Sequence, residues 1–168
     1  MRHNTRDTEK EKAFMEAIGR YDGVVRRVCF MYAGPSDPFD DLYQETMVNL
    51  WRGLDSYRGE ARLSTWIYRT TVNTCISCLR RNGRHASHSS LDEAITMVAG
   101  DDTQQQEMLR TMYTLISRLD PLEKAIVMMR LDEKSYDEIA AVTGLTRTNV
   151  ATRLHRAKEK MKNLSQTY

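Results

Sequence analysis

The clearest structural signature in the chain is Ser135-Tyr-Asp-Glu-Ile-Ala-Ala-Val-Thr-Gly-Leu-Thr-Arg-Thr-Asn-Val150. Within it, Ala140, Gly144 and Val150 form the pattern Ala-x3-Gly-x5-Val. A small Ala lets a second helix cross closely, a Gly allows the tight turn, and the Val packs the second helix onto the first. The stretch therefore predicts a helix-turn-helix.

Local signals mark where the helices around this motif begin. Ser135 and Glu138 form an S-x-x-E capping box, and Thr146 can cap the last helix. The pair Asp120-Pro121 supplies an N-cap and a first-turn proline, with Glu123 completing a capping pattern. A further helix just upstream is indicated by apolar residues at helical spacing: Leu109, Met112, Ile116 and Leu119.

The last predicted helix has an apolar inner side and a polar, basic outer side. Its inner side holds Val150, Leu154, Ala157 and Met161. The outer side, which also holds Lys160, can donate to phosphates and to purine edges in a major groove. A solvated basic helix is the alternative. The candidate DNA contacts are Arg147, Thr148, Asn149, Thr152, Arg153 and Arg156.

The N-terminal part predicts three more helices. Apolar residues spaced by four and three, from Phe14 to Tyr32, indicate an amphipathic helix that ends at Gly34-Pro35. Further helices are expected over about 38–54 and 63–81. We find no strand alternation and no internal repeat.

The polar stretch 82–106 predicts a flexible linker, because so long a segment without structure is uncommon inside one domain. The fold class is therefore all-α, with two small helical domains, 1–81 and 107–168, joined by this linker.

The helix expected over 63–81 also has two sides. At 100° per residue its apolar residues share one arc, and the other arc holds Trp66, Arg69, Thr70, Asn73, Thr74, Ser77 and Arg80. A tryptophan among polar residues has two interpretations. It packs as core beneath the preceding loop, or it stacks on unpaired bases beside phosphate-binding arginines.

Charge is unevenly distributed, although the net charge is only +2. Residues 37–60 carry a net charge of −4, residues 61–88 hold five arginines and no acid, and residues 146–162 hold six bases and one acid. This pattern favours two contacts with a polyanion and one with a basic partner surface, with solvated helix faces as the alternative.

Composition excludes several classes of protein. Hydrophobic residues make up 40% of the 168, and the eight glycines raise the apolar share to about 45%, which is typical of a globular chain. No apolar run reaches about 18 residues, so we expect no stable membrane insertion, and the densely charged N-terminus is not a secretory signal. Three cysteines cannot all pair within one chain, which argues for a reducing compartment and a cytoplasmic location.

Two metal-site interpretations are weak. Four possible zinc ligands fall within 14 residues: Cys75, Cys78, His85 and His88. Both cysteines, however, lie on the apolar arc of their helix, where a free thiol behaves as a small hydrophobe. An acidic cluster stands at a helix start, where the helix dipole favours negative charge in any case: Asp37, Asp40, Asp41 and Glu45. No nucleophile–base pair accompanies it, so we expect no metal, no cofactor and no enzyme activity.

The N-terminal part resembles the second conserved region of bacterial sigma factors. The resemblance rests on Asp41-Leu-x-Gln-Glu-Thr46, Trp51, Leu63-Ser-Thr-Trp-Ile-Tyr-Arg69, Asn73 and Leu79-Arg-Arg81. The C-terminal part resembles the fourth region at Leu119-Asp-Pro-Leu-Glu123, Ser135-Tyr-Asp-Glu-Ile-Ala140 and Val150-Ala-Thr-Arg-Leu-x-Arg-Ala-Lys158. The order, linker and short length are similar to the extracytoplasmic-function group, which keeps only these two regions.

The resemblance implies a dissociable initiation subunit of core RNA polymerase. It implies polymerase docking through Asp41, Gln44 and Glu45. Melting and reading of the downstream (−10) promoter element would fall to Arg58, Arg62, Trp66, Arg69, Asn73 and Arg80, and the last helix would read the upstream (−35) element. Val72, Ser77 and Ala151 differ from residues common in the family, so no promoter sequence is implied.

The family also suggests an inhibitory anti-sigma protein as a partner. The alternative from the residues alone is a helix-turn-helix transcriptional regulator that binds DNA independently of polymerase, at a two-fold symmetric operator.

Overall fold

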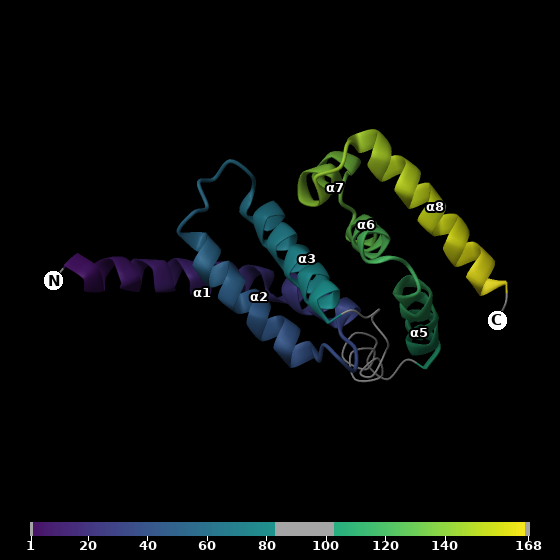
Figure 1. The fold of residues 1–168 in the computed structure, drawn as a ribbon, viewed down its shortest axis with the longest axis horizontal. Helices are drawn as coiled ribbons and strands as arrows, with labels where there is room; N and C mark the ends of the chain where they lie inside the picture. The colour runs from purple at the N-terminus through teal and green to yellow at the C-terminus, as the bar shows by residue number, and fades with distance from the viewer. Residues whose placement is uncertain (1, 83–102, 167–168) are drawn as a thin grey trace.

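The computed structural model describes residues 2–82 and 103–166, which form helices and no named strand (Figure 1). The order is α1 (Arg2–Tyr32), α2 (Phe39–Leu54), α3 (Leu63–Arg81), α5 (Thr103–Ser117), α6 (Pro121–Leu131), α7 (Tyr136–Thr143) and α8 (Arg147–Ser165). The all-α prediction is confirmed. We call residues 2–82 the first half and residues 103–166 the second half.

In the first half, α1, α2 and α3 pack against one another. Their apolar stripes meet in a shared core that includes Val25, Val28, Leu42, Leu50, Ile67 and Val72. The N-terminal turns of α1 extend beyond the body of the molecule (Figure 1). This packing leaves one side of α3 free to carry exposed polar residues.

In the second half, the turn between α7 and α8 has the expected helix-turn-helix geometry. Gly144 adopts φ 73°, a left-handed conformation that favours glycine because it has no Cβ. Val150 is fully buried beneath the first helix of the motif. Ser135 and Glu138 form the predicted capping box, and the Thr146 side chain caps α8 by accepting from the Asn149 backbone N–H.

One predicted cap is only half correct. Asp120 accepts hydrogen bonds from the backbone N–H groups of Leu122 and Glu123, as expected of an N-cap. The Glu123 side chain, however, does not reach back to complete the pattern. It is buried, and Lys160 of α8 donates to both of its oxygens at 2.8 Å. A buried carboxylate needs a charged partner, and α8 supplies one.

The two halves pack against each other. Helix α3 lies beside α7, and smaller contacts join α1 to α5 and α3 to α6 (Figure 1). The Tyr32 hydroxyl donates to the Pro121 carbonyl at 2.5 Å, and Phe30 meets Tyr113 edge to face with ring centroids 5.8 Å apart. Helix α5 begins at Thr103, so the last four residues of the predicted linker are helical.

Candidate nucleic-acid interface

The arrangement of α3 separates a buried side from an exposed polar side. The buried side of α3 faces the core and includes Ile67, Val72, Cys75 and Cys78. The exposed side carries Arg69, Asn73 and Arg80. These three lie on the arc that the sequence assigns to DNA. The helix holds them in a row because residues three or four apart lie on one face.

Trp66 lies at the start of this row, half-buried rather than free. Its ring stacks at a tilt on Tyr57 of the preceding loop, with centroids 5.2 Å apart. A Cβ at Gly53 would approach the Trp66 ring to 3.0 Å, so the ring also fits closely against the end of α2. This geometry matches the first interpretation of Trp66, packing beneath the loop. Its partial exposure leaves an edge of the Tyr57–Trp66 pair at the surface.

The loop before α3 carries the other downstream candidates. Arg58 and Arg62 are both exposed, and Arg62 occupies the N-cap position of α3 without a side-chain cap. The Tyr57 hydroxyl donates to the Ala61 carbonyl at 2.6 Å, which shapes the loop. Tyr57 was not among the predicted site residues, although an aromatic residue in a loop that carries two arginines was the available signal.

The acidic candidates lie in the first two turns of α2. Asp41 and Gln44 are exposed, and Glu45 is half-buried in a shallow polar groove between α2 and α3. Asn49, one turn further on, donates to Thr74 of α3 at 3.0 Å. These two helices are therefore fixed to each other, so that the acidic surface and the polar row of α3 keep one relative position.

The outer side of α8 presents the upstream candidates. Arg147, Thr148, Asn149, Thr152 and Arg156 are exposed, and Arg153 is half-buried. Arg147 lies 3.5 Å from Asp137 of α7, an exposed ion pair that water screens strongly. Lys160, on the same side, is occupied by Glu123 and is less available to a phosphate.

A groove of about 880 Å³ lies between the halves. Its walls come from α3 on one side and from the second half on the other. The lining includes Asn73, Ser77, Arg80, Asp120, Thr143 and Arg153. The structure thus brings two downstream candidates, Asn73 and Arg80, next to one upstream candidate, Arg153, which the sequence placed in separate domains.

Two polar groups at this junction, the buried Lys124 and the half-buried Asp132, were not anticipated. Lys124 of α6 is only 2% exposed and lies over the Tyr32 ring, 5.5 Å from its centroid. Burial lowers the pKa of Lys124 to about 8. Asp132 accepts from Arg27 at 2.9 Å and from Tyr68 at 3.4 Å. Burial and then the Asp132 charge raise the pKa of the Tyr68 phenol.

The cysteines Cys29, Cys75 and Cys78 are buried in the first half. A hydrogen bond with Cys29 and burial raise the pKa of the Cys75 thiol. His85 and His88, the other two ligands of the zinc interpretation, lie outside the described residues. Among the described residues no cluster of three potential metal ligands forms, and no helix has the length and apolarity to cross a membrane.

Comparison with family models matches both halves. The Sigma-70 region 2 model matches residues 17–85, and the Sigma-70 region 4 model matches residues 109–161. Together with the helix-turn-helix and the basic face of α3, these matches define a protein of the sigma-70 class.

Individual relatives identify the family within this class. The chain is 32% identical over 166 residues to the ECF RNA polymerase sigma-E factor of Escherichia coli (strain K12), covering 91% of this chain and 86% of that protein. It is 30% identical to the protein of the same name from Haemophilus influenzae, with 91% and 87% coverage. The chain belongs to the ECF family of sigma factors.

Solved structures share the fold. CnrH, solved in complex with the cytosolic domain of CnrY, has a TM-score of 0.66 at 21% identity and covers 94% of this chain and 90% of its own. The sigma factor RpoE of Bartonella quintana, solved in complex with the anti-sigma factor NepR, has a TM-score of 0.68 at 17% identity, covering 92% and 98%.

Proposed function

We propose that this chain binds core RNA polymerase and directs it to promoters, where it melts the downstream element. The observation that carries this proposal is the exposed row of Arg69, Asn73 and Arg80 on α3, held in fixed relation to the acidic start of α2. One rigid pair of helices thus offers a strand-binding face and a polymerase-binding face. Family membership supports both assignments.

The docking surface consists of Asp41, Gln44 and Glu45. The first two are fully available in the structure, and the surrounding residues 37–60 carry a net charge of −4. Such a surface suits a basic partner, because complementary charge speeds encounter and fixes orientation. No catalytic side chain takes part in this role, and RNA synthesis belongs to the polymerase.

Melting draws on binding energy. Unstacking a base costs a few kcal/mol, and stacking on an aromatic ring returns about 1–3 kcal/mol per base. Trp66 contributes through the edge it shares with Tyr57, or by holding the loop that carries Arg58 and Arg62. Arginines along α3 neutralise the strand backbone, which adds affinity that falls with salt.

Upstream recognition belongs to α8. Its exposed first turn, Arg147 to Asn149, is where a recognition helix enters the major groove. Thr152, Arg153 and Arg156 follow along the same side of the helix. Phosphate contacts there set the register, and base-edge contacts set the sequence.

An anti-sigma protein is the second partner that we propose. Both structural relatives were solved with a protein partner, one of them named as an anti-sigma factor. The groove between the halves, which is lined by candidate DNA residues, is where such a partner would block them.

Transcription in vitro with sigma-free core polymerase tests the docking surface. Asp41→Lys should weaken polymerase binding by about tenfold or more, because it places a positive charge against a basic surface. Glu16→Lys makes the same charge change on the exposed part of α1 and should leave binding unaltered. If Asp41→Lys initiates as well as the native chain, the docking assignment is wrong.

A second comparison separates melting from duplex binding. Trp66→Ala should lower open-complex formation more than binding to duplex promoter DNA, with circular dichroism confirming that the variant folds. If open-complex formation and duplex binding fall by the same factor, Trp66 has no role in melting and serves only in packing. Binding of the chain alone to a palindromic site, without any effect of polymerase, would favour the regulator alternative.

A further inference from the structure

The three cysteines of the chain have no part in the proposed function, although two of them form a close pair. Cys29 of α1 and Cys75 of α3 are both fully buried, and their side chains share a hydrogen bond. Both are free thiols in the structure. They lie where α1 packs against α3, so the pair joins two helices that are far apart in the sequence.

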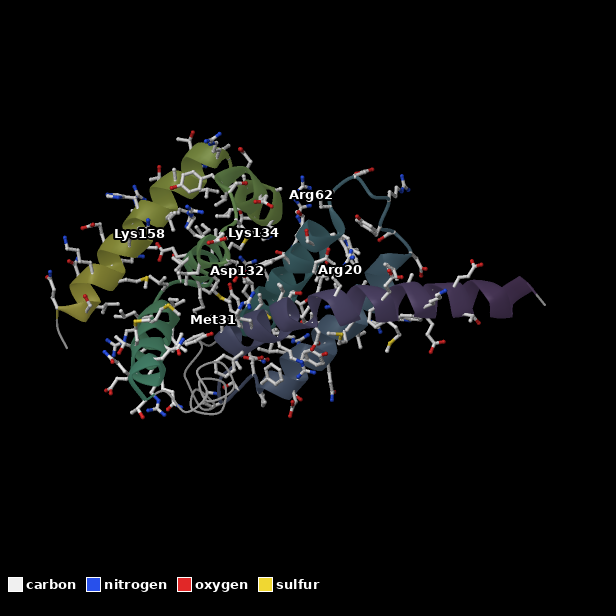
Figure 2. The ribbon with its side chains drawn as sticks, turned by 180° about the vertical axis from the view of Figure 1, so that it is seen from behind. Arg20, Met31, Arg62, Asp132, Lys134 and Lys158 are labelled. Atoms are coloured by element: carbon white, nitrogen blue, oxygen red, sulfur yellow. The ribbon has the colours of Figure 1, made fainter. Side chains whose placement is uncertain are left out.

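The pair lies in the part of α1 that other helices enclose. Met31, two residues after Cys29, is labelled at the end of α1 that lies within the body of the molecule, whereas the N-terminal turns of α1 project beyond it (Figure 2). Helix α2 closes the same point, because Cys29 Sγ lies 3.6 Å from the buried Thr46 Oγ1. The three helices of the first half therefore meet at Cys29.

The hydrogen bonds of the pair make Cys29 its nucleophile. The hydrogen bond with Cys75 chiefly lowers the pKa of Cys29, burial acts in the opposite direction, and the hydrogen bond with Thr46 lowers it further. A hydrogen bond with Cys29 and burial raise the pKa of the Cys75 thiol, which therefore keeps its proton and donates it to Cys29. Because the thiolate is the reactive form of cysteine, Cys29 is the sulfur that reacts first with an oxidant.

Helix geometry excludes the third cysteine as the partner of Cys75. Cys78 follows three residues later on α3, and Cβ atoms three residues apart on a helix are separated by about 5–6 Å. A disulfide needs about 3.5–4.5 Å between its Cβ atoms. The Cys78 sulfur also accepts a hydrogen bond from Arg81 at 3.4 Å. Cys29 is therefore the partner that Cys75 can reach without unwinding α3.

We propose that Cys29 and Cys75 are a site of reversible oxidation, at which hydrogen peroxide links α1 to α3 through a disulfide. The Cys29 thiolate attacks one peroxide oxygen, the O–O bond breaks, and Cys29 becomes a sulfenic acid while hydroxide leaves and is protonated to water. The Cys75 sulfur then attacks the Cys29 sulfur, the S–O bond breaks, and a second water leaves with the Cys75 proton. Two thiols give up two electrons and two protons, and one peroxide becomes two waters.

The burial of the pair selects a small oxidant. Both sulfurs are fully buried, so bulky thiol reagents reach them only when the first half unfolds. Local opening, by which buried groups meet solvent, more readily admits a molecule of nearly the size of water. Disulfides in reducing compartments are usually transient and redox-sensing. The pair therefore suits a response to peroxide rather than a permanent crosslink.

The disulfide changes the position of α3. Its sulfurs lie about 2 Å apart, closer than those of two hydrogen-bonded thiols, so α1 and α3 must shift relative to each other in a close-packed core. Thr74, next to Cys75, accepts from Asn49 of α2 at 3.0 Å, and Asn73 precedes it in the exposed row. The linkage therefore disturbs the fixed relation between α2 and this row. We expect lower open-complex formation, a consequence that rests on the proposed function, whereas the linkage itself does not.

Mass spectrometry of the full chain tests the linkage without polymerase. The folded chain is treated with hydrogen peroxide, its remaining thiols are alkylated, and trypsin leaves Cys29 in peptide 28–52 and the other two cysteines in peptide 70–80. These peptides should be joined in the native chain and in Cys78→Ala, the matched control at a second buried cysteine of α3. The joined fraction should be at least about tenfold smaller in Cys29→Ala and Cys75→Ala, which lack one of the two adjacent sulfurs.

The same reaction in urea shows whether the fold selects the pair. In the unfolded chain we expect the disulfide within peptide 70–80, because its two cysteines close a much shorter loop than Cys29 and Cys75 do. That same internal disulfide in the folded chain, or thiols oxidised without any linkage, would overturn the proposal and leave the cysteines as packing residues. If circular dichroism shows that Cys29→Ala does not fold, Cys29→Ser takes its place, since its hydroxyl keeps a hydrogen-bonding group beside Thr46.

Transcription by core polymerase tests the consequence, with the chain oxidised first and freed of peroxide. Open-complex formation by the native chain and Cys78→Ala should fall about tenfold, since misplacing a positioned group by about 1 Å costs up to about a hundredfold. A thiol reductant should restore it, and Cys29→Ala should resist peroxide. Oxidised methionines do not explain such a difference, because the exposed Met15 and Met108 are common to all variants and thiol reductants do not restore them.

The two readouts separate this inference from the proposed function. A linked chain that initiates as well as the reduced chain would show that the disulfide does not regulate melting. A reduced native chain that never initiates with core polymerase would contradict the proposed function, and the joined peptides would still establish the oxidation site. Initiation by the reduced chain without any joined peptides would support the proposed function and overturn the oxidation site.

Discussion

In the second half of the chain, side chains close the starts of three consecutive helices; in the first half they do not. Asp120, Ser135 and Thr146 each accept from a backbone N–H at the start of α6, α7 and α8. The N-cap residues of α2 and α3 are Pro38 and Arg62, and neither makes a side-chain cap hydrogen bond. The helix-turn-helix is therefore specified by local sequence, whereas the first half depends on the packing of long apolar stripes.

If the first half depends on core packing, removing a core side chain there should have the largest effect on the free energy of unfolding. Leu50 is 1% exposed on the core side of α2. Leu50→Ala should lower the free energy of unfolding by about 2–5 kcal/mol, since the lost side chain leaves a cavity. Hydrogen exchange followed by mass spectrometry should show the loss in α1 to α3. Protection lost equally in α7 and α8 would mean that the halves do not differ in this way.

Lys124 tests the junction between the halves. Its pKa of about 8 in the folded chain is below the ordinary 10.5. Below pH 8 the Lys124 ammonium is charged in both the folded and the unfolded chain, and its burial opposes folding. Between pH 8 and 10.5 the folded chain loses the proton first, so this group makes the free energy of unfolding rise with pH.

Lys124→Met should accordingly stabilise the chain at pH 7 by about 1–3 kcal/mol and remove this contribution to the pH dependence. Urea unfolding of both chains at pH 7 and pH 9.5 measures the difference, in which the tyrosines and cysteines common to both cancel. Lys162→Met, at an exposed position of α8, is the control and should change little. A destabilised Lys124→Met with an unchanged pH slope would show that the ammonium is not buried.

Two glycine substitutions sharpen the contrast between local and packing control. Gly144→Ala should cost about 1–2 kcal/mol, because φ 73° is unfavourable for a residue with a Cβ. Gly23 lies in an exposed and open position of α1. Gly23→Ala should raise the free energy of unfolding by about 0.5–1 kcal/mol, because alanine loses less backbone entropy than glycine when the chain folds. Thermal unfolding of the two variants measures both; the same sign for both would be inconsistent with the backbone assignment.

The smallest predicted effect compares two serines near helix starts. Ser135→Ala removes the capping box and should cost about 1 kcal/mol. Ser64→Ala, in the first turn of the uncapped α3, should cost much less. Hydrogen exchange of the first turns of α7 and α3 reports the two helix starts separately, and comparable losses of protection at both would remove the distinction between the halves.

The elements that sequence predicts well are those with local causes. Gly144, the Ser135 cap and the apolar stripes each act within a few residues, so the helix-turn-helix and the helices of the first half could be placed. Glu123 was assigned wrongly, because its partner Lys160 lies 37 residues away and enters only through packing. The same holds for Asp132 and Lys124, whose environments combine both halves.

The candidate site divides along the same line. The exposed side of α3 follows from helical periodicity, and the family motifs indicate what it binds. The contact between Arg69 and α7 could not be predicted, since it joins residues 72 positions apart. Trp66 is an intermediate case. The sequence left both core packing and base stacking open for its side chain, and the structure shows that its ring packs against the Tyr57 ring and close to Gly53.

The most direct test of the central claim is start-site mapping on genomic DNA transcribed by sigma-free core polymerase, with and without the native chain. The account predicts new, discrete start sites, each preceded by two shared sequence elements at fixed spacing, and their loss with Asp41→Lys. An unchanged set of transcripts would contradict the account.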